Sequence, residues 1–208
     1  MFTGIVTDIG TVAFRDGQRL GISSRYQSSS IAPGASIACD GCCLTVVRLR
    51  EGDDGGAFFE VDVSNETASH TTLAAWQEGT RINLERSLAL GDELGGHLVT
   101  GHIDGTARIV GRRQDGDSVR FEVAAPPNLA RYIAQKGTVA LNGVSLTVND
   151  VDGVRFAVNL IPYTLRHTNW ADRQAGDLVN LEVDLLARYV ERLASERFTS
   201  LRPGEDAA

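Results

Sequence analysis

Residues 40–46 read Asp-Gly-Cys-Cys-Leu-Thr-Val, and residues 142–148 read Asn-Gly-Val-Ser-Leu-Thr-Val, at an offset of 102 positions. In both stretches a Gly-containing pair precedes a β-prone run, which predicts a turn leading into a strand. Self-similarity at a fixed spacing is typical of internally duplicated folds. We therefore expect two copies of one unit.

Matches on either side of this stretch extend the duplication at an offset of 97 positions. Thr3-Gly4 corresponds to Thr100-Gly101, residues 66–71 to 163–168, and residues 82–85 to 179–182. The five-residue difference falls in the first copy at residues 51–56, a polar Gly-rich loop where insertions cost little. The predicted domains are residues 1–96 and 97–184, followed by a C-terminal helix and tail at 185–208.

Within each copy the pattern favours strands. Residues 59–63 and 156–160 alternate between apolar and polar side chains, and Gly, Asn, Asp or Pro separate the runs. Many short strands favour a small closed barrel, because closure removes exposed edges. Helices are predicted at residues 87–90 and from Asp184 to about Arg197. The second is amphipathic, with an apolar face formed by Leu186, Tyr189, Val190 and Leu193, and we expect that face to pack on another subunit.

Composition excludes several classes of function. A net charge of -7 over 208 residues argues against a nucleic-acid partner. With neither a leader nor a membrane span in the sequence, the chain is expected to be cytoplasmic and to have no membrane partner. The three cysteines lie within residues 39–43, which predicts free thiols rather than disulfides. The Cys39–Cys42 spacing lacks a second ligand pair, so we interpret it as part of a buried strand and expect no metal.

Differences between the copies single out candidate site residues. His102 stands where the first copy has Ile5, and an imidazole is the usual proton carrier near neutral pH; a surface role is the alternative. At three other positions the second copy also has the more polar or charged residue. Ser145 corresponds to Cys43 of the first copy, Lys136 to Gly34, and Asp184 to Ser87. Asp184 and Ser87 could equally be helix N-caps, and Lys136 a solvated loop charge.

Other candidates are the same in both copies. Thr45 and Thr147 could bond to a planar heterocycle at a barrel mouth, or could simply favour the strand. His70 and His167 are equivalent, which favours a structural hydrogen bond over catalysis.

The N-terminal Met-Phe-Thr-Gly-Ile-Val, residues 40–46, 95–105 and 142–148, and Asn159-Leu-Ile-Pro162 together resemble the signature segments of the riboflavin synthase family, in the same order along nearly the whole chain. The resemblance implies two six-stranded Greek-key barrels that bind lumazine, and a homotrimer held by the C-terminal helices. It implies a reaction without cofactor or metal, in which two molecules of 6,7-dimethyl-8-ribityllumazine give riboflavin and 5-amino-6-ribitylaminouracil. Association with lumazine synthase is a further partner that the resemblance allows.

The resemblance also implies which residues form the site. Phe2, Cys43, His102, Ser145, Thr147 and Asp184 are expected near the chemistry, with His102 and Ser145 as proton carriers and Asp184 orienting a partner group. The substrate-binding set of the first barrel is Gly4, Ile5, Val6, Cys43, Leu44, Thr45, Asp62, Val63, Ser64, Asn65, Glu66 and Thr67. That of the second barrel is Gly101, His102, Ile103, Lys136, Ser145, Leu146, Thr147, Ile161, Pro162, Tyr163, Thr164, Leu165 and Arg166.

Two positions depart from the family pattern. Ala68 stands where Leu is usual, and Tyr163 stands where Glu or His is common, both at the edge of a pocket. Two other functions fit a duplicated barrel: a non-catalytic lumazine- or flavin-binding antenna protein of the same fold, and an interaction scaffold. The polar residues of the second copy favour the enzyme over both.

Overall fold

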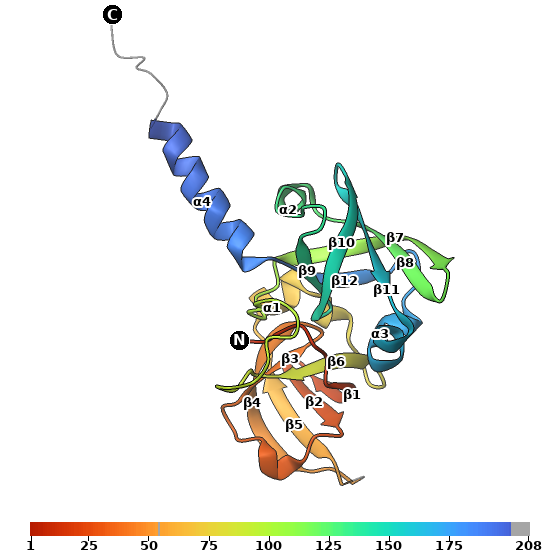
Figure 1. Cartoon of the computed structure of the whole chain (residues 1–208). Coiled ribbons are helices and arrows are strands. Elements are labelled where there is room, and N and C mark those ends of the chain that lie inside the picture. The colour runs from red at the N-terminus through yellow and green to blue at the C-terminus, as the bar shows by residue number, and fades with distance from the viewer. Residues whose placement is uncertain (54, 201–208) are drawn as a thin grey trace, which may run out of the picture.

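The computed structural model describes residues 1–53 and 55–200, with side chains as far as Ser195. It contains two closed six-stranded antiparallel barrels, one above the other in Figure 1, and a C-terminal helix that projects away from both. The first barrel consists of β1 (Asp8–Asp16), β2 (Arg19–Ser24), β3 (Ser36–Cys39), β4 (Cys42–Glu51), β5 (Ala57–Asp62) and β6 (Arg81–Arg86). The second consists of β7 (Gly105–Asp115), β8 (Ser118–Ala124), β9 (Thr138–Leu141), β10 (Val144–Asp152), β11 (Arg155–Leu160) and β12 (Leu178–Val183).

The two barrels have the same strand order. The first runs β1-β2-β5-β4-β3-β6, and the second has the corresponding strands in the same cyclic order. The neighbours β2–β5 and β3–β6 are Greek-key pairings, since neither pair is consecutive in the chain. Corresponding strands β1 and β7 also carry a bulge at matching positions, as do β4 and β10. The predicted duplicated barrel fold is confirmed.

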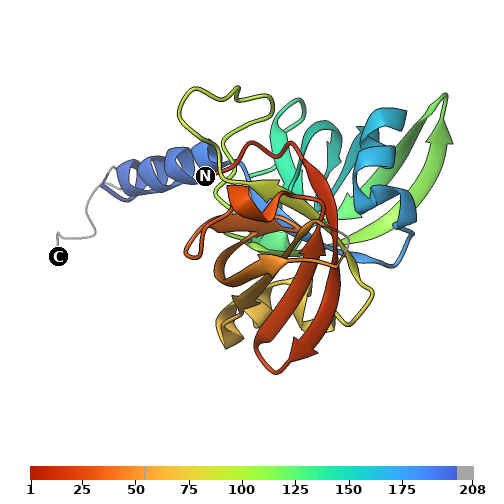
Figure 2. The ribbon, with the colours of Figure 1, turned by 90° about the horizontal axis from the view of Figure 1, so that it is seen from below.

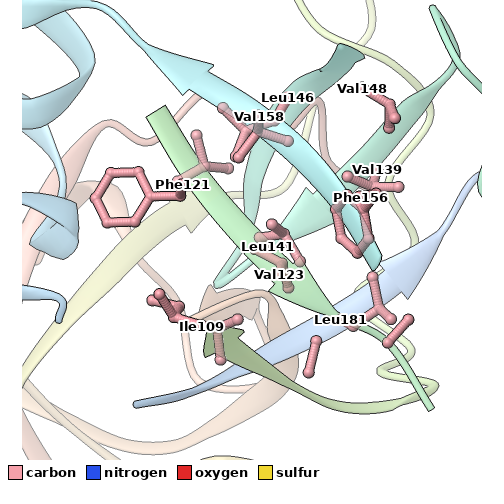
Figure 3. Close-up of a cluster of buried hydrophobic side chains, with 14 of the residues drawn as sticks. Ile109, Phe121, Val123, Val139, Leu141, Leu146, Val148, Phe156, Val158 and Leu181 are labelled. Atoms are coloured by element: carbon pink, nitrogen blue, oxygen red, sulfur yellow. The ribbon is translucent and has the colours of Figure 1, made fainter. Parts of the chain in front are cut away.

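Each barrel has its own hydrophobic core. In the second, side chains from all around the barrel converge on its axis (Figure 3), with Phe121 packed edge-on against Trp170. In the first, Phe59, Ile22 and Leu84 fill the equivalent space. Inward residues alternate with outward ones along the strands, as expected from strand geometry.

Short helices connect the strands. They are α1 (Asn65–His70), α2 (Pro127–Ala130) and α3 (Pro162–His167), and the 3₁₀ turns η1 (Ser28–Ser30), η2 (Thr72–Ala75) and η3 (Asn169–Asp172). The helix predicted at residues 87–90 is wrong. That segment is coil ending in a turn, with Gly91 at φ +98° and the Asp92 carboxylate accepting from the Ala89 amide.

The predicted tail helix is present as α4 (Leu185–Ser200). The apolar residues Leu186, Tyr189, Val190 and Leu193 are 63–67% exposed, and Figures 1 and 2 both show the helix extending from the barrels. Residues 201–208 of the predicted tail lie outside the described part. In that part no helix has the length and apolar composition that a membrane crossing requires.

Candidate functional site

Two short segments, each preceding the first strand of a barrel, hold the candidate site together. We call residues 2–6 the first lead-in and residues 99–103 the second lead-in. Phe2 and Val99 are equivalent, and their backbones pair with each other in both directions at 2.7 and 3.1 Å. A pseudo-twofold relation between the barrels therefore passes through this pair.

A buried glutamate at the end of each barrel holds its lead-in. The Glu85 carboxylate accepts from the Thr3 amide and hydroxyl and from the Gly4 amide at 2.7–2.9 Å. Glu182 makes the same three contacts, over the same range, with Thr100 and Gly101. Burial raises the pKa of both carboxyls, and these donors oppose the rise. The repeated sequence at residues 82–85 and 179–182 thus encodes a clamp for the lead-ins.

Each lead-in reaches across to the other barrel. The Ser145 amide on β10 donates to the Gly4 carbonyl at 2.8 Å, and the Cys43 amide on β4 donates to the Gly101 carbonyl at 2.9 Å. Val6 packs against the core of the second barrel, and Ile103 against the core of the first. The sequence analysis grouped Gly4, Ile5 and Val6 with the first barrel, and Gly101, His102 and Ile103 with the second. The structure instead brings each of these segments against the opposite barrel. Sequence order cannot show that the lead-ins cross.

The crossing completes a cavity of about 290 Å³ on the first barrel, which we call the first pocket. The second lead-in supplies one wall, and β4 and the α1 region supply the rest. Among the predicted residues it brings together Cys43, Glu66, Thr67, Gly101, His102 and Ile103; it also includes Cys42, His70 and Thr71.

His102 lies where two cavities meet. It is exposed and lines the first pocket on one side. On the other side it lines a cavity of about 380 Å³ between the second lead-in and α4, whose walls include Arg188 and Tyr189. Its equivalent Ile5 is also exposed. The same backbone position thus presents an imidazole from one lead-in and an alkyl group from the other.

The corresponding place on the second barrel, around Ser145, is called the second site. It contains His97, a histidine that comparison of the two copies missed. The His97 Nδ1 lies 2.7 Å from the Ser145 Oγ, and the His97 amide donates to the Thr3 carbonyl. His97 Nε2 is buried and has no hydrogen-bond partner among the described residues. Burial lowers the pKa of His97, so the ring is neutral at pH 7. An offset of 97 would put the counterpart of His97 before Met1, where comparison of the copies cannot reach.

The two equivalent histidines of α1 and α3 differ. The His167 ring bonds to the Tyr163 carbonyl at 2.8 Å and stacks on the Tyr163 ring at 4.0 Å, which confirms the expected structural role there. His70 makes no such bond within the described residues and instead lines the first pocket. The predicted structural hydrogen bond is therefore not found for His70 in the described part of the chain. Tyr163, the departure from the family pattern, supplies the ring on which His167 stacks.

Strand alternation divides the remaining strand residues. Cys43 and Ser145 are half-buried, and Thr45 and Thr147 are exposed on the outer faces of β4 and β10. Leu44 and Leu146, by contrast, point into the barrel cores, and Val63 is buried with them. Substrate binding by these three residues stays a prediction, and their side chains are turned into the cores.

Three further candidates have structural partners, and a fourth is exposed. Phe2 is fully buried in a small core between the barrels, so it supports the site and does not line it. Asp184 accepts from the Leu186 amide at 2.9 Å as the N-cap of α4, and also from the Thr138 hydroxyl. Asp62 forms a two-pronged ion pair with Arg19 at 2.9 and 3.2 Å. Lys136 is exposed at φ +65°, where the first copy has Gly34 at φ +88°.

The residues flanking α1 and α3 occupy matching places. Ser64 caps α1 by accepting from the Thr67 amide at 3.0 Å, whereas Pro162 begins α3. Ala68 and Leu165 are equivalent and pack against their respective barrel cores. Asn65, Ile161, Tyr163, Thr164 and Arg166, which were also predicted, are exposed or half-buried.

The two paired cysteines lie in a buried hairpin. Cys39 and Cys42 face each other across the β3–β4 turn, and both are buried free thiols. Burial raises the pKa of Cys39, and that of Cys42 to about 12, so neither is a thiolate at neutral pH. The interpretation as part of a buried strand agrees with this placement.

Comparison with a family model matches this chain twice. The model is the lumazine binding domain, and it matches residues 3–87 and 100–184, one match on each barrel.

Individual proteins match over almost the whole chain. The riboflavin synthase of Brucella abortus is 54% identical over 198 residues, covering 93% of this chain and 98% of that protein. The riboflavin synthase of Mycobacterium tuberculosis is 43% identical over 202 residues, with coverage of 93% and 98%. Among solved structures, LumP complexed with riboflavin superposes with a TM-score of 0.76 at 25% identity, covering 88% of this chain and 99% of that one.

Proposed function

This chain belongs to the riboflavin synthase family and shares its activity, and on that premise we propose how its two barrels divide the reaction. One 6,7-dimethyl-8-ribityllumazine donates a four-carbon unit to a second, which gives riboflavin and 5-amino-6-ribitylaminouracil. We assign one lumazine to the first pocket and the other to the second site. The observation that carries this assignment is the crossing of the lead-ins, which builds two related but unequal sites.

In the first pocket, His102 is the proposed proton carrier. Its side chain lines the cavity together with Cys43 and Thr67, so it can reach a bound ring from the lead-in side. Proton transfer by a positioned side chain contributes about 10²–10⁴-fold to a rate. Thr67 is assigned to binding, because its hydroxyl already bonds to Ser64 at 2.9 Å and is held in place.

At the second site, Ser145 and His97 form the proposed polar pair. With the His97 ring neutral, Nδ1 can accept the Ser145 proton, which leaves the Oγ lone pairs free for a substrate group. His97 is the neighbour that orients Ser145. Thr147 lies two residues further along the outer face of β10 and is assigned to binding.

Much of the acceleration is assigned to juxtaposition. Holding two reactants in attack geometry is worth effective molarities of about 10⁵ M or more. Identical substrates that must meet face to face are suited to two sites related by a pseudo-twofold axis. We propose that the first pocket of one subunit meets the second site of a neighbour.

The proposed assembly is a homotrimer formed through α4. One side of the helix is held by the second barrel, through ion pairs of Arg188 with Asp104 and of Glu191 with Arg131. The apolar side, including Leu186 and Leu193, is left exposed, and contiguous exposed apolar surface marks interaction sites. The second cavity that His102 lines, beside α4, would then lie close to a neighbouring subunit. Association with lumazine synthase stays a prediction from the resemblance.

The test is turnover. Purified protein is incubated with 6,7-dimethyl-8-ribityllumazine, and riboflavin is followed by fluorescence. We expect many product molecules per chain; binding of lumazine without product would identify an antenna protein instead. The fold is shared with LumP, which was solved in complex with riboflavin, and 54% identity to a riboflavin synthase favours the enzyme.

Assembly is tested separately by analytical ultracentrifugation. A trimer is expected for the full chain, and Leu193→Lys should dissociate it because the charge would be buried against a neighbour. The control Ala194→Lys places the same charge about 100° around the helix from Leu193, away from the centre of the apolar side, and should dissociate the trimer less. A monomeric wild-type chain would contradict the proposed assembly and, with it, the meeting of the two sites across subunits; turnover tests the activity independently.

A further inference from the structure

The junction between the barrels contains a buried carboxylate where the equivalent residue is neutral. Asp40 and Asn142 begin the two equivalent hairpin turns, with φ +43° and +46°. Each side chain accepts a backbone amide of its own barrel: Asn83 donates to Asp40 Oδ1 at 2.7 Å, and Asn180 donates to Asn142 Oδ1 at 2.8 Å. An amide oxygen is therefore sufficient for this contact, and the Asp40 charge is not needed for it.

These turns lock the two barrels together. The Asn83 Nδ2 donates to the Asn142 carbonyl and the Asn180 Nδ2 to the Asp40 carbonyl, both at 2.9 Å and both across the junction. Gly41 and Gly143 lie so close that a Cβ on either would come within 2.7 Å of the other's amide nitrogen. A change in the charge of Asp40 therefore acts at the centre of the junction.

The surroundings of the two side chains break the symmetry. The Asn169 Nδ2 on η3 donates to Asp40 Oδ1 at 2.9 Å, whereas the equivalent Thr72 has a buried hydroxyl without a hydrogen bond among the described residues. Arg173 follows η3, and its equivalent is the buried Trp76. The second barrel thus presents an amide and a guanidinium to Asp40, and the first presents neither to Asn142.

The ion pair at this place is incomplete. The Arg173 Nη2 lies 3.9 Å from Asp40 Oδ2, beyond hydrogen-bond distance. Asp40 Oδ2 and Arg173 Nε are both buried, and within the described residues neither has a hydrogen-bond partner. Two complementary groups therefore face each other across a gap that a small movement of Arg173 would close.

Few charges act on this carboxylate. From β6 and η3 it meets the uncharged Asn83 and Asn169, and its neighbour on β3 is the Cys39 thiol, whose pKa burial raises well above the ordinary value. β12 contributes the uncharged Asn180 to its carbonyl. Arg173 is the charged group that faces it in the part of the chain that the structure describes. Ionisation of Asp40 is then coupled chiefly to the position of Arg173.

We propose that Asp40 and Arg173 form a pH-responsive latch between the barrels. When Asp40 is neutral, the junction is held by hydrogen bonds alone, as on the Asn142 side. When Asp40 is ionised, the carboxylate attracts the Arg173 guanidinium across the gap, at the cost of a buried charge. This latch is independent of the assigned reaction.

The direction of the pH effect follows from burial. Burial raises the pKa of Asp40 from 3.8 to about 7, against the opposing effects of Asn83, Arg173 and Asn169. The folded state holds this proton more tightly than the unfolded state does. The stabilisation is complete below pH 3.8 and is lost as the pH rises to about 7.

The experiment measures denaturant unfolding midpoints of the wild type and Asp40→Asn between about pH 5 and 8. We expect the midpoint of the variant to exceed that of the wild type by a margin that widens up to about pH 7 and then levels off. The same comparison is made in the Arg173→Met background, with and without Asp40→Asn. There the margin between the two midpoints should keep widening to higher pH, because the cation that lowers the pKa of Asp40 is gone. A margin that is constant over this range would overturn the proposal.

Two further measurements keep the proposal falsifiable. Asn142→Asp introduces a carboxylate at the equivalent turn without a guanidinium partner, and it should lose more stability above pH 7 than the wild type; an equal pH response would show that Arg173 has no part in the latch. If Asp40→Asn does not fold, NMR titration of the wild-type Asp40 carboxyl carbon decides. A midpoint near 7 supports the latch, and an ionised carboxyl throughout overturns it.

Discussion

The two barrels agree in backbone and differ in proton-carrying side chains. They share strand order, bulge positions, glycine turns and a glutamate clamp on each lead-in. The second half, however, contributes His102 opposite Ile5, Ser145 opposite Cys43, and a His97 without a counterpart. The comparison indicates that the duplication supplies two related sites, while divergence supplies different chemistry to each.

The largest expected effect is on the shared backbone. Gly41→Ala would place a Cβ 2.7 Å from the Gly143 amide nitrogen at φ +81°, and we expect a loss of about 3–5 kcal/mol in the free energy of unfolding. Gly34→Ala is the matched control. An alanine at its φ of +88° is also strained, but its Cβ would meet no atom within 4 Å. It should cost only about 1–2 kcal/mol. Equal losses of unfolding free energy in the two variants, measured by chemical denaturation, would mean that the backbones at the junction can move apart at little cost.

The next effect concerns the lead-ins. His102→Ile makes the second lead-in resemble the first, and we expect kcat to fall about 10²-fold, with lumazine affinity changed less than about twofold. Thr67→Val in the same pocket should weaken binding more than it lowers kcat, because its hydroxyl is assigned to binding. Steady-state kinetics and calorimetry separate the two quantities. Equal changes in kcat and affinity at His102 would reduce it to a binding residue.

A smaller effect distinguishes the two sites by pH. Since burial lowers the pKa of His97 from its ordinary 6.5, the neutral ring that Ser145 needs should persist below that pH. The acid limb of kcat/KM assigned to this ring is therefore expected below pH 6.5, and Ser145→Ala should remove it while lowering kcat about tenfold. Cys43→Ser, the exchange at the equivalent position, should leave the limb in place. An unchanged limb in Ser145→Ala would contradict the assignment.

The smallest effect separates the equivalent histidines. His167→Ala removes a hydrogen bond and a ring stack, so the free energy of unfolding should fall by about 1 kcal/mol with lumazine affinity unchanged. His70→Ala should leave stability unchanged and weaken lumazine binding about two- to threefold, because its ring lines the first pocket. Thermal unfolding and calorimetry of both variants test this. The reverse pattern would contradict the difference between the two copies.

The duplication and the barrel class could be predicted because both are written into local patterns. The repeated turn at residues 40–41 and 142–143 appears directly in the sequence, and strand alternation predicts which of Cys43 and Leu44 faces outward. The predicted helix at residues 87–90 failed, because four residues carry too little periodicity to compete with the glycines that follow.

The site itself could be predicted only in part. His102, Ser145 and Cys43 emerge from comparison of the copies, but the crossing of the lead-ins depends on long-range contacts such as Gly4 with Ser145, which have no local signal. His97 was missed because it has no counterpart in the first copy to be compared with, and its contact with the distant Ser145 has no local signal. His70 and His167 look alike in sequence, and only the neighbouring Tyr163 separates their roles.

The central claim is that each lead-in completes the site of the opposite barrel. It is tested most directly by NMR of the Ser145→Ala variant with bound 6,7-dimethyl-8-ribityllumazine, recording nuclear Overhauser effects from the ligand methyl groups. We predict that one bound ligand contacts Cys43 together with Ile103, and that the other contacts residue 145 together with Ile5. A ligand that contacts Cys43 together with Ile5 would contradict the account.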